Sequence, residues 1–265
     1  MTTSSAASAS TISSSIHPRG LYTLFFTEMW ERFSYYGMRA LLVMFFTASL
    51  LDGGWGWPRE HAYAIFGTYT SLVYLSTLLG GYFADKKIGY RYAVVIGALL
   101  MTLGHGAMAI ETPFFIYLGL TLLVFGSGFF KPNMTSIISE MYKGKDEKKD
   151  GAYTIFYMGV NAGAFLGILL CGYLGEQVGW RWGFGLAGIF MLFGLLQFWF
   201  AQNIFGDIGT KPVKVDSGAV ELSADEPKLN PFTSLQLGLI AIAGVLGISW
   251  IFNDPISKIS EGAYN

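Results

Sequence analysis

The sequence has few charged residues. Only 13% of its 265 residues are charged, against about 25% in an average soluble domain, and its mean hydropathy is +0.45. The 17 basic and 18 acidic residues leave a net charge of −1, so the chain lacks the positive field that nucleic-acid binding requires. These shortages exclude an ordinary soluble enzyme, and we expect no nucleic-acid partner.

Cysteine and histidine are also scarce. Cys171 is the single cysteine, so the chain cannot form an intramolecular disulfide. The three histidines, His17, His61 and His105, show no metal-ligand spacing, and we expect His105 to be a hydrogen-bonded helix residue. No phosphate-binding Gly-x-x-x-x-Gly-Lys motif occurs. We therefore expect neither a metal nor an organic cofactor.

What the sequence does contain is long apolar runs. About 20 apolar residues cross the ~30 Å core of a bilayer as a helix, and the runs do not alternate as barrel strands do. The fold class predicted is therefore an all-α integral membrane protein. We expect six spans, at residues 21–51, 60–84, 92–110, 114–141, 152–175 and 182–204. A seventh apolar run follows at 235–252.

The polar stretches define the domain organisation. We expect a disordered tail over 1–19, a six-helix bundle over 20–204, a linker over 205–230 and the start of a further helical region over 231–265. If the N-terminus is inside, eleven Lys and Arg residues fall in inner segments, and only Arg59 and Arg181 fall outside. This bias predicts a cytoplasmic N-terminus, tail and linker.

The first span carries charges that a bilayer disfavours. Glu28, Glu31, Arg32 and Arg39 fall within about 100° of one another on a helical wheel, and two tyrosines lie on the same face. A central charge costs about 2.5–3.5 kcal/mol by insertion measurements. The stripe indicates a solvated transport pathway, although an isolated Glu-Arg pair could equally lock two helices together.

The fourth span contains a similar anomaly, Lys131, beside the helix-kinking Pro132. We predict that Lys131 is the counter-ion of Glu28 or Glu31, so that protonating the acid releases the lysine and gives a proton-driven switch. The alternative is that Lys131 reaches the cytoplasmic side. Because Lys131 lies about 18 Å of helix from the charged loop at Lys143, that reach is long.

These residues resemble the proton-dependent oligopeptide transporter (POT/PTR) family of the major facilitator superfamily. The likeness covers about residues 20–204. Four segments carry it: residues 28–37 (EMWERFSYYG), 81–91 (GYFADKKIGYR), 130–133 (FKPN) and 156–163 (FYMGVNAG). The resemblance implies a symporter for di- and tripeptides, driven by protons and working by alternating access between two six-helix bundles. This chain would supply the N-terminal bundle, built from 3+3 inverted repeats, in a cell membrane such as the bacterial inner membrane.

The resemblance also implies roles for individual residues. Protons would be the coupling ion, carried by Glu28, Glu31, Arg32 and Lys131. The peptide would be bound by Arg39, Tyr35, Tyr36, Tyr74, Lys131 and Asn161, with Tyr69 a competitor for the place of Tyr74. A conformational latch would be formed by Gly81, Asp85, Gly89 and Arg91.

Two other functions stay open from the residues themselves. The same scaffold could carry another anion such as nitrate, and a membrane-embedded enzyme could use Glu28 or Glu31 as an acid or base. We expect a transporter rather than an enzyme. Its partners would be the peptide, the lipid bilayer and a second bundle of the same polypeptide. Glycines 159, 163 and 167 recur every fourth residue and predict close packing of a neighbouring helix.

Overall fold

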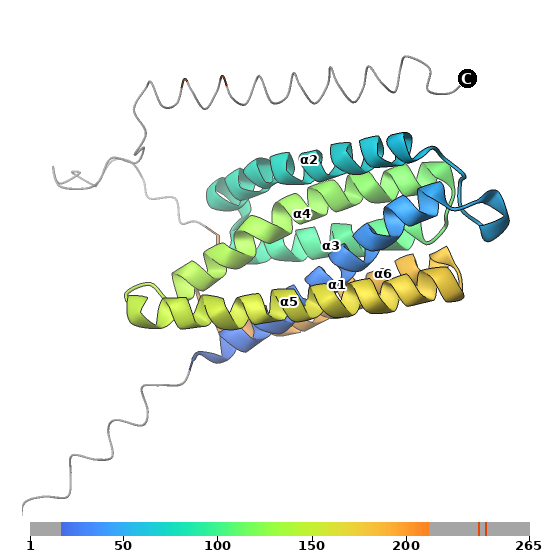
Figure 1. Ribbon diagram of the computed structural model, residues 1–265. Helices are drawn as coiled ribbons and strands as arrows, with labels where there is room; N and C mark the ends of the chain where they lie inside the picture. The colour runs from blue at the N-terminus through green and yellow to red at the C-terminus, as the bar shows by residue number, and fades with distance from the viewer. Residues whose placement is uncertain (1–16, 212–237, 239–241, 243–265) are drawn as a thin grey trace, which may run out of the picture.

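The structure, a computed structural model, describes residues 17–211 and the isolated positions Gly238 and Ile242. Six long helices in that part of the chain confirm the predicted all-helical bundle (Figure 1). They are α1 (Arg19–Thr47), α2 (Arg59–Phe83), α3 (Tyr90–Met108), α4 (Pro113–Met141), α5 (Asp146–Gln177) and α6 (Trp180–Phe200).

Five of the helices are long and apolar enough to cross a membrane, from α2 to α6. Helix α1 has the length, at 29 residues, but contains Glu28, Glu31, Arg32 and Arg39. The chain is thus a multi-pass membrane protein in which α1 is the charged helix. The expected seventh run at 235–252 lies outside the described residues, apart from Gly238 and Ile242. Most of the expected tail and linker also lies outside them, so the proposed domain division stays a prediction.

Proline and glycine set the helix boundaries. Pro18 and Pro58 precede α1 and α2, and Pro113 opens α4, where a missing N–H breaks no intrahelical bond. Gly89 precedes α3 with a φ of 81°, and Gly179 precedes α6 with a φ of 140°. Both values lie in the region that favours glycine, so these sharp turns depend on it.

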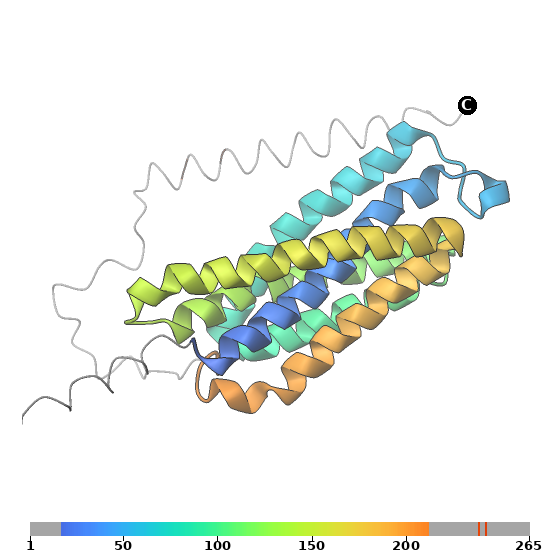
Figure 2. The same cartoon turned by 60° about the horizontal axis from the view of Figure 1, so that its bottom comes forward.

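The helix contacts follow an inverted-repeat pattern. Helix α1 packs on α5 and α6, α4 packs on α2 and α3, and α3 also meets α6. If α1, α2 and α3 are exchanged with α4, α5 and α6 in order, the α1–α5 contact becomes the α4–α2 contact and the α1–α6 contact becomes the α4–α3 contact. The α3–α6 contact is unchanged. The two orientations of the ribbon show α1 crossing the bundle beside α5 and α6 (Figures 1 and 2). This symmetry matches the expected 3+3 arrangement.

Glycines allow the close approach of α5 to α1, as predicted. A Cβ atom on Gly163 would clash with the carbonyl oxygen of Met29, and one on Gly167 would clash with that of Phe33. Since hydrophobic driving force between helices is weak in lipid, such backbone contact is a main source of helix association. The contact fixes the charged part of α1 against α5.

The two ends of the bundle are closed by different contacts. At one end Trp180 donates its indole N–H to the carbonyl of Asp52 at 2.9 Å, which ties the α1–α2 loop to α6. At the other, His17 Nδ1 lies 2.6 Å from the hydroxyl of Tyr142. Burial raises the pKa of Tyr142 above its ordinary value, so this phenol stays protonated at neutral pH and can donate to His17.

We predict that Gly167→Ala destabilises the bundle, because the added methyl group meets the backbone of Phe33. Overpacking of this kind costs about 1–3 kcal/mol. Gly172→Ala on the same helix is the matched control, since nothing lies within 4 Å of its Cβ position. Thermal unfolding of the purified protein measures both. Equal unfolding temperatures for the two variants would contradict the proposed contact.

Candidate functional site

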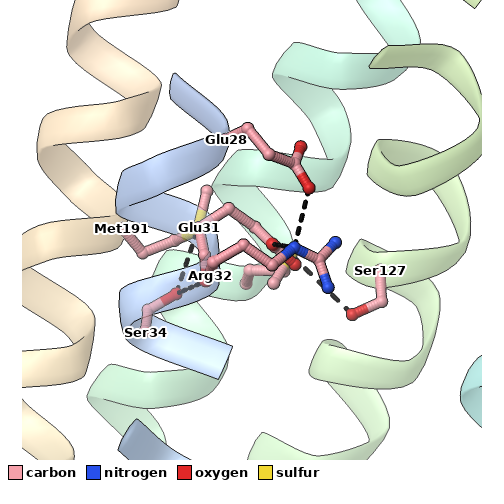
Figure 3. A network of polar contacts seen from close by, with 7 residues as sticks. Glu28, Glu31, Arg32, Ser34, Ser127 and Met191 are labelled. Carbon is pink, nitrogen blue, oxygen red and sulfur yellow. Dashed lines mark hydrogen bonds and ion pairs between the residues drawn. The ribbon is translucent and has the colours of Figure 1, made fainter. Parts of the chain in front are cut away.

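The charged residues of α1 form a compact cluster. Arg32 Nε lies 2.7 Å from Glu28 Oε1 and 2.7 Å from Glu31 Oε2, so one guanidinium serves two carboxylates (Figure 3). The side chains of Arg32, Glu28 and Glu31 are 12%, 5% and 0% exposed. The three side chains lie together, as their shared face on the helical wheel predicted. Their burial makes the pairing obligatory, because an isolated charge there is costly.

The two carboxylates are not equivalent. The Nε–H of Arg32 is aligned for a hydrogen bond with Glu28. Glu31 is held by charge alone, since neither of its buried oxygens has a hydrogen-bond partner among the described residues. A buried carboxylate normally accepts several hydrogen bonds. Glu31 is therefore the acid whose ionised form is least satisfied, and the stronger candidate to take up a proton.

Two buried serines complete the network and were missed by the sequence argument. Ser34 donates to the carbonyl oxygen of Glu31 at 2.8 Å and lies 3.4 Å from Met191 Sδ. Ser127 of α4 points toward the guanidinium of Arg32 (Figure 3). Among the described residues its hydroxyl has only Met101 Sδ, at 3.9 Å, as an acceptor. The available signal was a serine within an apolar helix, which is too common to single out.

Lys131 reaches the same site but does not pair with the acids. Its Nζ lies 4.0 Å from the ring centroid of Tyr35 and 6.0 Å from that of Tyr74. Within residues 17–211 no ion pair joins Lys131 to Glu28 or Glu31. The expected counter-ion contact is thus absent from this arrangement of the helices. The lysine is instead stabilised by the face of an aromatic ring.

Arg39, like Lys131, forms no ion pair within residues 17–211. It lies one helical turn beyond Tyr35, with Cζ 5.0 Å from the ring centroid of Phe66. Tyr36 packs edge-on against Tyr35, with centroids 5.3 Å apart. Arg39 and Lys131 therefore provide a cationic region lined by aromatic rings, next to the α1 acids and not neutralised by them.

The structure separates the two candidate tyrosines of α2. Tyr69 is only 3% exposed and faces an apolar cavity of about 360 Å³ between α2 and α4. Tyr74 is 67% exposed and borders Lys131. Tyr74 is thus the better placed to meet a ligand. Asn161 of α5 is also exposed, with no hydrogen bond in the described residues, so its amide is available to an external partner.

The four expected latch residues lie around the α2–α3 connection. Gly81 has open space at its Cβ position, and Asp85 lies in a π-helical turn, η2 (Ala84–Ile88), where it interacts with the Tyr90 hydroxyl. A side chain on Gly89 would clash with Thr210. Of these three residues, the structure thus brings Gly89 close to the segment that follows α6.

Arg91 forms most of that contact. Its Nε donates to Gln202 Oε1 at 2.6 Å and its Nη1 to the carbonyl of Gly206 at 2.5 Å. The backbone N–H of Gly209 donates to Glu140 Oε2 at 2.7 Å. Residues 202–210, which we call the post-α6 segment, are therefore tied to α3 and α4. Nothing in the sequence pattern indicated this connection.

His105 differs from its expected state. It is fully buried in α3, and neither ring nitrogen has a hydrogen-bond partner in the described part of the chain. The expectation of a satisfied helix histidine was therefore wrong. The physical reason is that the surrounding helix surfaces present small or apolar groups, such as Gly188 beside its Cβ. No group of residues suited to a metal ion occurs among the described residues.

A membrane-spanning bundle of inverted repeats with a buried charge cluster has the architecture of a secondary transporter. The comparisons agree. A model of the POT family matches residues 91–219. The chain is 45% identical over 185 residues to the peptide transporter YePEPT of Yersinia enterocolitica, which covers 69% of this chain and 36% of that protein. It is 42% identical over 201 residues to a di-/tripeptide transporter of Lactococcus lactis subsp. cremoris. That match covers 74% of this chain and 40% of the transporter.

Solved structures show the same relationship. A crystal structure of a peptide transporter POT in complex with sulfate aligns with a TM-score of 0.71 and 38% identity, over 94% of this chain and 48% of that one. The chain belongs to the POT family, whose members are transporters and not enzymes. It spans less than half the length of the curated relatives above and corresponds to their N-terminal half.

We predict that Arg32→Met destabilises the protein severely, by about 3–5 kcal/mol, because it leaves two buried carboxylates unpaired. Adding Glu28→Gln and Glu31→Gln to the same chain should restore much of the loss, since neutral amides need no counter-ion. Thermal unfolding of the single, double and triple variants measures the coupling. A triple variant as unstable as Arg32→Met would show that the pairing is not the cause.

A second prediction concerns the post-α6 segment. Arg91→Ala removes the side-chain bonds to Gln202 and Gly206, so this segment should open more often and chymotrypsin should cut after the buried Phe205 several times faster. Lys86→Ala, an exposed charge in the preceding turn, is the control and should leave the rate unchanged. Equal cleavage rates in the two variants would contradict the contact.

Proposed function

We propose that this chain forms the N-terminal half of a proton-coupled symporter for di- and tripeptides that works by alternating access. It lies in a cell membrane with its N-terminus in the cytoplasm, and a second bundle completes the transport path. Protons serve as the coupling ion. The observation that carries the proposal is the buried Glu28–Arg32–Glu31 cluster beside two cations, Arg39 and Lys131, that have no carboxylate partner in the described residues.

The site chemistry supports a peptide as substrate. A zwitterionic dipeptide needs a cationic contact for its carboxylate, and walls that tolerate variable side chains. Arg39 and Lys131 offer the cations, Tyr35, Tyr36 and Tyr74 offer aromatic walls, and Asn161 offers a free amide. Relatives named peptide and di-/tripeptide transporters support this assignment. The contact for the peptide amino group would come from the second bundle.

The asymmetry of the acids supports coupling to protons. Protonating Glu31 removes one of the two negative charges that Arg32 balances, and adds a hydroxyl that can donate a hydrogen bond. Arg32 would then repel the nearby Lys131 more strongly, because fewer negative charges screen it. Binding of a peptide carboxylate at Lys131 becomes more favourable as a result. Proton and peptide are thereby linked through neighbouring charges in one bundle.

Transport of another anion such as nitrate is the second candidate. The same two cations favour it, and one solved relative is in complex with sulfate. The aromatic walls and the exposed amide of Asn161 favour the peptide, because a small inorganic anion needs only the cations. Competition experiments separate them: an excess of unlabelled dipeptide should block uptake, and an excess of nitrate should not.

The test is uptake of a labelled dipeptide by the full-length protein in liposomes, with and without an inward proton gradient. We predict gradient-dependent accumulation, and its loss by roughly tenfold or more in Lys131→Ala, as expected when a coupling interaction is removed. Exchange of internal for external peptide, which needs no net proton movement, should decline less. Accumulation that is indifferent to the gradient in the unmodified protein would overturn the proposal.

The matched control is Lys143→Ala. Lys143 is exposed just beyond the end of the same helix, so it tests the loss of a lysine without disturbing the site. Driven uptake should stay at the unmodified level. If both variants lose uptake equally, the loss is caused by a change in overall charge or in folding. The role assigned to Lys131 would then be wrong.

A further inference from the structure

A surface groove lies away from the charged site, at the end of the bundle where α3 ends and α6 begins. It has a volume of about 510 Å³. We call it the α3–α6 groove, and six of the residues that line it are Ile110, Leu174, Arg181, Trp182, Gly185 and Ile189. None of the transport roles above involves these residues.

The α3–α6 groove is charged at one end and apolar along the rest of its length. Its walls are aliphatic or glycine along α6 from Gly185 to Ile189, and its single charged lining residue, Arg181, stands at the start of that helix. The rise from Arg181 to Ile189 is about 12 Å of helix, comparable to the upper part of an acyl chain. A cation at one end and an apolar channel below it match a phosphate with a hydrocarbon tail.

The charged end of the groove is open to a ligand. Arg181 is exposed and makes no hydrogen bond or ion pair within residues 17–211. The neighbouring Trp182 is 59% exposed, and tryptophan at a helix end is typical of the headgroup level of a bilayer. Unpaired guanidinium groups bind phosphate oxygens in bidentate geometry.

We propose that the α3–α6 groove binds a phospholipid from the surrounding leaflet, with its phosphate on Arg181 and an acyl chain along Leu186 and Ile189. The phospholipid fills a cavity that the bundle leaves open on its membrane-facing surface and steadies the ends of α3, α5 and α6 against each other. This site is independent of the proposed transport function, so failure of either leaves the other standing.

The experiment is native mass spectrometry of the delipidated full-length protein titrated with phosphatidylglycerol. Arg181→Gln should weaken binding roughly fivefold, as expected for one basic residue at an anionic lipid. Arg59→Gln, a second exposed arginine at the same end of the bundle, is the matched control and should bind as the unmodified protein does. Equal affinity of the Arg181 variant and the unmodified protein would overturn the proposal.

A second variant tests the groove without changing charge. Nothing lies within 4 Å of the Cβ position of Gly185, so Gly185→Leu fits the fold and fills the groove. It should abolish the bound lipid, whereas Gly67→Leu, at an equally open position on α2, should keep it. Unchanged binding in Gly185→Leu would overturn the proposal, as would an unmodified protein that binds no lipid because another part of the protein covers the groove.

Inorganic phosphate distinguishes the lipid from a free anion. The acyl chain adds packing contacts along the groove that inorganic phosphate lacks, so millimolar phosphate should not displace the lipid. Displacement by phosphate would assign Arg181 to a soluble anion, and the lipid proposal would fall.

Discussion

The structure depends on placing one guanidinium between two carboxylates inside a membrane-spanning bundle. Arg32 holds Glu28 and Glu31 at 2.7 Å each, and the bilayer leaves these side chains few alternatives, since water cannot solvate them where they are buried. The three side chains leave a net negative charge that the pairing does not cancel. Within the described residues neither Arg39 nor Lys131 forms an ion pair with these acids, so the surplus charge has no direct partner and the cluster can respond to a proton.

The backbone contact between α1 and α5 makes this arrangement possible. Gly163 and Gly167 bring α5 against the carbonyl oxygens of Met29 and Phe33, which lie within and just after the charged turn of α1. A helix held this closely cannot rotate its charged face toward lipid. Shape complementarity, which carries no charge itself, therefore determines where the charges point.

Much of this could be predicted from the sequence because the relevant signals are local. Span length, the glycine period and the i, i+4 spacing of Glu28 and Arg32 each follow from a few neighbouring residues, and each was confirmed. The contacts of Lys131, His105 and Arg91 depend on residues from other helices. Lys131 meets an aromatic ring, His105 meets apolar helix surfaces and Arg91 meets the post-α6 segment. These surroundings are set by packing that no local pattern encodes.

Burial divides the site into two parts with different chemical roles. Glu28 and Glu31 are sealed within the bundle at 5% and 0% exposure, whereas Tyr74 and Asn161 lie exposed and Arg39 and Lys131 only partly covered. A proton, which can move along transient water, can reach the sealed acids. A peptide cannot, so under the proposed function it would bind at the open face that a second bundle would cover. The six-helix bundle thus contains all the residues of the buried charge cluster but only one side of the proposed substrate site. Covering of the open side by a second bundle would link proton uptake to peptide binding.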